Sequence, residues 1–125
     1  MRIFISLIIL AISLQSYADD FSGLWVWDEN NGKHTFSIRT EKEGERLVGS
    51  YCAVGMSGSR IDCSPNSSKK FPINFNGSDF EFTTNYSGTV GVARITLIKE
   101  KLHWVIVKQP NGEHYAPKKA ILSKQ

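Results

Sequence analysis

The sequence lacks several features that would each indicate a familiar class of protein. No segment after residue 18 keeps a 3.6-residue apolar period over a helical length, which excludes a helical bundle or a parallel sheet with helical crossovers. The basic residues form no continuous stripe, so we expect no nucleic-acid partner. The histidines, His34, His103 and His114, lack His-x-His and His-x-x-x-His spacing, and we expect no metal site and no cofactor.

Charge is distributed unevenly along the chain. One unit of the formal net charge of +3 comes from Arg2 in the N-terminal segment. Residues 19–45 hold seven acidic and three basic residues, whereas residues 46–125 hold five acidic and eleven basic residues. Such a dipole can steer an oppositely charged partner.

The first eighteen residues have the pattern of a secretory signal peptide. One positive charge at Arg2 precedes an apolar run from Ile3 to Leu14, and a small-residue exit ends at Ala18. The run is shorter than the about 20 residues that span a bilayer, so we expect cleavage after Ala18 and no stable membrane insertion. We expect a single mature domain of residues 19–125 in the bacterial periplasm.

The two cysteines, Cys52 and Cys63, enclose a stretch rich in glycine and serine, "AVGMSGSRID". In an exported chain they are expected to form one disulfide bond, because an oxidising compartment removes the reason to keep thiols free. A loop of this length closed by a disulfide contributes about 3 kcal/mol in the chain-entropy description.

Apolar residues alternate with period two in almost every later segment, which predicts an all-β fold. The side chains expected to share one face of a strand are His34, Phe36 and Ile38; Leu47, Gly49, Tyr51 and Ala53, with Val48, Ser50, Cys52 and Val54 opposite; Phe71, Ile73 and Phe75; and Phe80 and Phe82. The sets expected to face the core are Ala93, Ile95 and Leu97, and Leu102, Trp104 and Ile106. Hairpin signals separate these runs at residues 30–32, 43–45, 76–78, 86–88 and 110–112. The pattern predicts an antiparallel up-and-down meander of about eight strands, closed into a small barrel by pairing of "GLWVW" with "KKAIL". A two-sheet sandwich is the alternative.

The first third of the chain resembles the opening of another group of barrels. Gly23 and Trp25 in "FSGLWVW", followed by Gly49 and Tyr51 in "LVGSY", are similar to the start of calycin barrels, the avidin and lipocalin superfamily. The resemblance implies a small β-barrel and, as one alternative function, a small-ligand carrier. The later ligand-contacting aromatic residues of avidins have no match here, so a biotin site is not implied.

The clamped segment carries a second resemblance. "GSYCAVGMSGSRIDC" is similar to a motif of small exported bacterial proteins, some of which neutralise enzymes that attack the envelope. Periplasmic lysozyme inhibitors insert a loop containing Ser and Gly into the cleft of their target, and the matching stretch here is Ser57-Gly58-Ser59-Arg60. The resemblance implies a protein partner, such as a cell-wall-degrading or toxin enzyme.

The residues of the clamped segment suit recognition on their own chemistry. Two glycines permit a tight turn, arginine binds carboxylates with a planar fork, and methionine makes adaptable apolar contacts. The residues expected to contact a partner, within a loop of residues 53–62, are Met56, Ser57, Ser59 and Arg60. A plain hairpin with a bridged base explains the same residues. We expect a periplasmic protein-binding module, an inhibitor or immunity protein acting on an envelope enzyme.

The sequence contains no complete motif for serine hydrolysis and no pattern typical of a pair of catalytic carboxylates. In "GMSGS" a glycine directly follows Ser57, whereas the nucleophile elbow of a serine hydrolase has its second glycine two places after the serine. The elbow also lies on a turn from a strand to a helix, and no helix is expected here. The carboxylates Glu41, Glu43 and Glu45 lie in a predicted hairpin beside basic residues, where solvation explains them. We therefore expect no enzymatic activity.

Aromatic residues are expected mainly to fill the core, because an eight-stranded barrel holds side chains or one small ligand but rarely both. The candidates to line a ligand pocket, if the interior is used by a carrier, are Trp25, Trp27, Tyr51 and Trp104.

Overall fold

The computed structural model describes residues 21–27, 35–55, 59–65, 70–85 and 87–125. Over these ranges the chain forms strands and turns. The strands are β1 (Gly23–Trp27), β2 (Thr35–Glu43), β3 (Arg46–Gly55), β4 (Arg60–Cys63), β5 (Phe71–Pro72), β6 (Asn76–Thr83), β7 (Val90–Ile98), β8 (Lys101–Lys108) and β9 (Lys119–Lys124). In the described ranges, no helix is long and apolar enough to cross a bilayer.

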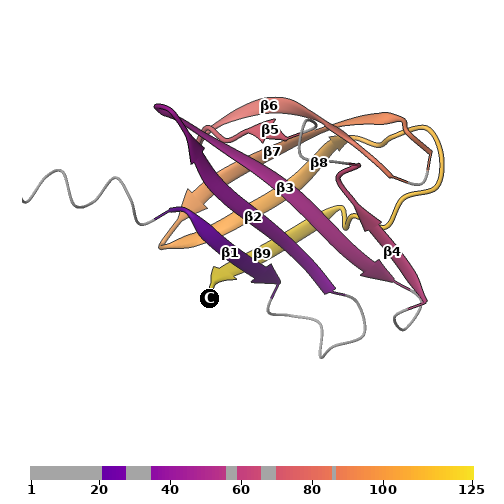
Figure 1. The fold of residues 1–125 in the computed structure, drawn as a ribbon, viewed down its shortest axis with the longest axis horizontal. Helices are drawn as coiled ribbons and strands as arrows, with labels where there is room; N and C mark the ends of the chain where they lie inside the picture. The colour runs from indigo at the N-terminus through magenta and orange to yellow at the C-terminus, as the bar shows by residue number, and fades with distance from the viewer. Residues whose placement is uncertain (1–20, 28–34, 56–58, 66–69, 86) are drawn as a thin grey trace, which may run out of the picture.

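All strand pairs are antiparallel and belong to one curled sheet (Figure 1). The order is β4-β3-β2-β1-β9-β8-β7-β6, so the strands nearest the two chain ends, β1 and β9, lie side by side in the middle of the sheet. The prediction of an all-β meander, with "GLWVW" paired to the C-terminal strand, is therefore confirmed. The sheet forms a half-barrel whose edge strands are β4 and β6.

The short strand β5 bridges the seam of this half-barrel. It pairs with β3 through Gly49 and Phe71, beyond the point where β4 leaves β3. From there the Phe71 ring stacks on Phe80 of β6, with ring centroids 4.7 Å apart. Gly49 permits this crossing, because a β-carbon there would lie 2.8 Å from Ile73 and 2.9 Å from Phe71. The curvature is thus stabilised by aromatic packing across the seam.

The core follows the alternation seen in the sequence. Most of the expected inward side chains are buried, including Phe36, Ile38, Ala93, Ile95 and Leu102, each fully shielded from solvent. The outermost members of the expected sets, Leu47, Phe75, Leu97 and Ile106, are half-buried and pack against the core. Alternation therefore predicted which side chains of these strands share a face, because period two is a local property of extended backbone, although Val48 on the other face of β3 is buried as well.

The turns agree with the sequence in part. Gly44 adopts φ +66° in the β2–β3 hairpin, and Gly88 adopts φ +63° between β6 and β7, as the turn signals predicted. The expected hairpin at residues 76–78 is wrong. These residues begin β6, and the pairing with β7 shifts register between Asn76 and Asp79, so Gly77, at φ +83°, serves a β-bulge.

Two connections differ from the sequence expectations. Residues 110–112 were expected to form a hairpin, but they lie in a longer connection, residues 109–118, where Pro110 is buried. The β7–β8 hairpin turns instead at Lys99 and Glu100, which adopt φ +50° and φ +66°. Asn-Gly or Asp-Gly normally occupy such positions, so this turn has no recognisable sequence signal.

Candidate functional site

The clamped segment is a β-hairpin. β3 and β4 pair from Cys52 opposite Cys63 to Gly55 opposite Arg60, and the two cysteines form the predicted disulfide directly across the ladder, with Cα atoms 4.0 Å apart. The expected loop of residues 53–62 is therefore too long, since only residues 56–59 connect the strands. The cause is that strand pairing continues past the disulfide toward the tip.

The predicted contact residues fall in different places. Met56 and Ser57 lie outside the described residues. Ser59 and Arg60 are exposed at the tip of the hairpin, as expected for a recognition element. The structure adds Ile61, which the sequence interpretation passed over and which is 58% exposed.

The outer face of the hairpin is apolar and carries a charged neighbour. Val54 of β3 lies opposite Ile61 of β4, next to the disulfide on the same face. Arg60 lies opposite Gly55, on the other face of the ladder, so the end of the hairpin presents an exposed aliphatic side chain on one face and an exposed arginine on the other. Ile61 alternates with Asp62, whose side chain faces the interior, and this alternation is the sequence signal that places Ile61 on the outer face.

Asp62 anchors the hairpin to the rest of the protein. Its side chain is fully buried, and its Oδ1 accepts hydrogen bonds from the Tyr51 hydroxyl at 3.1 Å and the Asn85 amide at 3.0 Å. Its Oδ2 accepts from the amide of Tyr115 at 2.9 Å. One carboxylate therefore joins β4, β3, the β6–β7 turn and the connection that precedes β9. No local pattern marks such a residue, because its donors come from distant parts of the chain.

Contacts around Gly55 complete the anchoring. A β-carbon at Gly55 would lie 2.7 Å from the ring of Tyr115, so glycine lets this ring pack directly on the end of β3. The Tyr115 hydroxyl donates to Glu113 at 2.9 Å. Tyr115 therefore links the hairpin through its backbone amide at Asp62 and through its ring at Gly55.

The Tyr51 hydroxyl is held in its neutral form. Burial raises the pKa of Tyr51 far above its usual value, and the neighbouring Asp62 carboxylate raises it further. The neutral hydroxyl is the state that donates to Asp62, so the hydrogen bond and the shifted pKa support each other.

This shift predicts a loss of stability at alkaline pH. The unfolded chain releases the Tyr51 proton near pH 10 whereas the folded chain keeps it, so stability should fall above pH 10 with a slope that approaches about 1.4 kcal/mol per pH unit. Urea unfolding between pH 8 and 11.5 measures this slope. Tyr51→Phe should make the fall shallower, because phenylalanine has no proton to release in the unfolded chain. Equal slopes for the wild type and Tyr51→Phe would contradict the assignment.

The interior of the half-barrel is filled by aromatic rings around Trp104. Five ring centroids lie 5.1 to 6.4 Å from that of Trp104, and they belong to Phe36, Tyr51, Phe71, Phe80 and Phe82. The Trp104 indole donates to the carbonyl of Pro117 at 2.8 Å. These rings occupy the space in which an interior ligand would lie.

The residues expected to line a ligand pocket are not gathered around one space. Trp25, Tyr51 and Trp104 are each at most 2% exposed, whereas Trp27 is half-buried. The indole nitrogen of Trp27 has no hydrogen-bond partner among the described residues. Three of the four are thus buried, with Trp104 at the base of the groove on β7–β9 and Trp25 at the base of a separate pocket at the end of the half-barrel.

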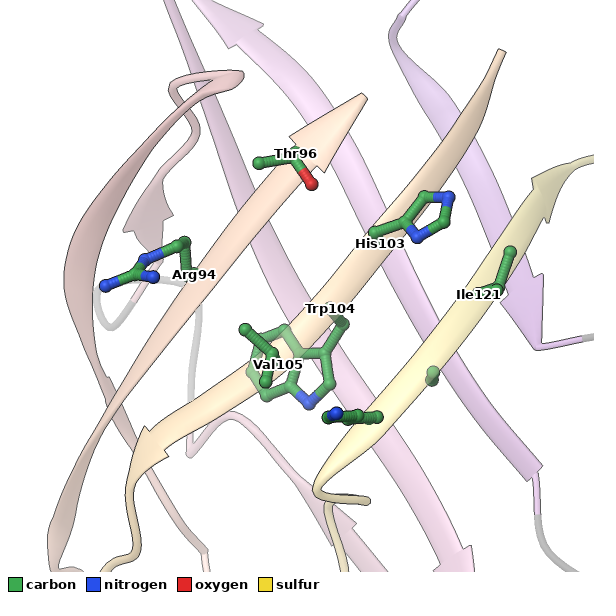
Figure 2. A pocket seen from close by; sticks show the side chains of 8 residues that line it. Arg94, Thr96, His103, Trp104, Val105 and Ile121 are labelled. Atoms are coloured by element: carbon green, nitrogen blue, oxygen red, sulfur yellow. The ribbon is translucent and has the colours of Figure 1, made fainter. Parts of the chain in front are cut away.

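A shallow groove of about 350 Å³ lies on the outer face of β7, β8 and β9 (Figure 2). Thr96, His103 and Ile121 form one cross-strand row in it, and Val105 belongs to the next row. Arg94 at its border is paired with Asp79 at 2.7 Å. The groove therefore offers one imidazole beside apolar and hydroxyl groups, with no carboxylate among its lining residues.

Acidic side chains near the β2–β3 turn form surface ion pairs. Lys70 bonds to both Glu41 and Glu43, and the hydrogen bond from Lys70 lowers the pKa of Glu43. Within the described ranges, no group of three or more His, Cys, Asp or Glu residues is arranged to hold a metal ion. His34 lies outside those ranges.

The fold and the site define an antiparallel half-barrel that presents a disulfide-bridged, internally anchored hairpin. No protein-family profile, curated protein or solved structure matches the chain. The function therefore has to be inferred from the hairpin and its surroundings.

Proposed function

We propose that this protein is an exported protein-binding module that inhibits or neutralises an enzyme acting on the cell envelope, with the β3–β4 hairpin as its recognition element. The observation that carries the proposal is the exposed pair Arg60 and Ile61 at the end of a hairpin fixed by a disulfide and by Asp62. The disulfide supports export, because such bonds persist in oxidising compartments.

The anchoring reduces the cost of binding. Association orders flexible side chains and loops, at about 0.5–1.5 kcal/mol for each immobilised side chain. Here the strands next to the tip are already ordered by the ladder from Cys52 to Gly55 and by three hydrogen bonds to Asp62. More of the contact energy of the tip is therefore retained as affinity.

The chemistry of the tip suits a cleft that contains carboxylates. Arg60 can form a bidentate pair with a carboxylate, and Ile61 supplies apolar area on the opposite face of the hairpin, so a cleft can be contacted from both sides. Enzymes that cleave glycosidic bonds carry a pair of carboxylates in their cleft. A single projecting hairpin is narrow enough to enter such a cleft.

Basic residues on the C-terminal strands support approach to an acidic partner. The exposed Lys108, Lys118 and Lys119 lie where β8 ends and β9 begins, whereas the exposed Lys101 and Lys124 lie at the other end of these strands, away from the hairpin tip. A surface of one charge sign raises the association rate with an oppositely charged partner, and the effect weakens as salt increases.

The proposal is tested by capture from periplasmic extract with three forms of the purified protein. The wild type should retain a partner that Arg60→Glu loses, because the reversed charge repels a carboxylate-lined cleft. Arg39→Glu makes the same charge change on the exposed face of β2 and should retain the partner. The retained protein is identified by mass spectrometry and then assayed for inhibition. Equal capture by all three forms would refute the role of the tip.

A further inference from the structure

A second pocket, of about 610 Å³, opens at the end of the half-barrel opposite the hairpin tip. At this end β1 begins, β9 ends and β7 turns into β8 (Figure 1). The volume lies within the about 300–1,000 Å³ range of small-molecule sites. The proposed recognition hairpin contributes no residue to its lining.

The floor of this pocket is apolar and fixed. It is formed by Phe21, Trp25 and Leu97. The indole nitrogen of Trp25 donates to the Phe21 carbonyl at 3.2 Å and to the Thr40 hydroxyl at 3.3 Å, so its polar atom is satisfied. The Phe21 ring packs edge-on against Phe75, with centroids 5.1 Å apart. The floor therefore suits a hydrocarbon chain.

The rim of the pocket is cationic. Lys99, Lys101 and Lys124 line it, together with the single acid Glu100. Lys101 donates to the Ser123 hydroxyl on the neighbouring strand. This hydrogen bond holds the Lys101 ammonium group at the mouth of the pocket. A β-carbon at Gly23 would lie 3.2 Å from the end of the Lys124 side chain, so glycine leaves room for this lysine at the mouth. The rim favours an anionic group.

The turn that supplies the rim is locally unfavourable. Lys99 and Glu100 both adopt left-handed φ values, +50° and +66°, at positions where Asn-Gly would be relaxed. Backbone in such conformations persists where the side chains have a role or the surroundings impose it. A role for the Lys99 side chain at the pocket accounts for a lysine at the first of these positions.

We infer that this pocket binds a single-chain anionic amphiphile, a fatty-acid carboxylate or a molecule of the same chemistry. The hydrocarbon chain lies on Phe21, Trp25 and Leu97, and the anionic head pairs with Lys99 and Lys101. Both parts of the ligand are required, because the floor has no free polar atom at Trp25 and an exposed lysine pair alone binds an anion weakly.

Calorimetric titration of the purified protein with dodecanoate, below its micelle concentration, tests this inference. We expect saturable binding at one site. Lys99→Gln combined with Lys101→Gln should weaken binding by about tenfold, since two exposed ion pairs are removed. Lys108→Gln combined with Lys118→Gln removes the same charge outside the pocket and should change the affinity by less than about twofold. Leu97→Gln should also weaken binding, because it replaces an apolar side chain in the floor of the pocket by a polar one.

Further ligands separate the possible sources of a signal. Dodecanol should bind at least about tenfold more weakly than dodecanoate, and inorganic phosphate should not compete. Absence of saturable binding, equal loss in both double-lysine variants, or equal affinity for dodecanol would overturn the inference. Binding to anionic vesicles without binding to monomeric dodecanoate would also overturn it. The outcome is independent of partner capture by the hairpin, since Arg60 does not line this pocket.

Discussion

Replacement of Asp62 by alanine is expected to lower the free energy of unfolding by about 3–5 kcal/mol, because Asp62 is the one charged side chain among the buried polar residues that the structure describes. The change leaves three donors without their acceptor, the Tyr51 hydroxyl and the amides of Asn85 and Tyr115. All three surround a side chain with no solvent exposure, so water does not replace the lost carboxylate without a rearrangement. Urea unfolding at pH 7, followed by tryptophan fluorescence, measures the loss.

Two further variants serve as controls for the Asp62→Ala measurement. Asp62→Asn keeps one carbonyl acceptor and should cost less than Asp62→Ala. Asp79→Ala removes a carboxylate that pairs with Arg94 but is 46% exposed, and it should cost less than about 1 kcal/mol. A loss below about 1 kcal/mol for Asp62→Ala would show that Asp62 does not anchor the hairpin.

Replacement of Trp104 by alanine is expected to destabilise the protein by about 3–5 kcal/mol through the cavity it leaves. The ring is 1% exposed and lies among five other aromatic rings, so its removal eliminates contacts on every side. The substitution also leaves the Pro117 carbonyl without its indole donor. Thermal and urea unfolding both measure the effect.

Trp104→Phe separates the two contributions. Phenylalanine retains much of the ring volume but cannot donate to Pro117, so its cost should lie well below that of alanine. An alanine variant that is as stable as the wild type would mean that the interior collapses without loss, contrary to a core centred on Trp104.

The strands could be predicted from the sequence because their signals are local. Alternation placed Phe36, Ile38 and Ile95 in the core, and the glycine at residue 44 marked a hairpin that the structure contains. The pairing of β1 with β9 followed from the need to satisfy strand edges in a meander. The disulfide was predicted from the cysteine count together with the expectation that the chain is exported.

Features that depend on distant residues escaped prediction. β5 bridges the seam because Phe71 meets Phe80, which no short pattern reveals. The β7–β8 turn uses Lys99 and Glu100, whose composition is not that of a tight turn. No short pattern marked Asp62 as buried, yet three donors from distant parts of the chain make it the anchor of the hairpin.

The candidate site was predicted in outline. Ser59 and Arg60 are exposed at the hairpin tip, as the glycine- and serine-rich composition indicated. The length of the loop was wrong because strand pairing extends to Gly55 and Arg60. Ile61 was missed because residues 53–62 were expected to form a loop, whereas strand pairing places Ile61 on the outer face and Asp62 inward.

The central claim, that the hairpin tip contacts a protein partner, is tested most directly by photo-crosslinking in cells. A photoreactive amino acid is placed at Ile61 in one form and at Ile98 in another, two exposed aliphatic positions at opposite ends of the half-barrel. The proposal predicts a covalent adduct with one protein from position 61, its loss with Arg60→Glu, and no such adduct from position 98. No adduct from position 61, or the same adduct from both positions, would contradict it.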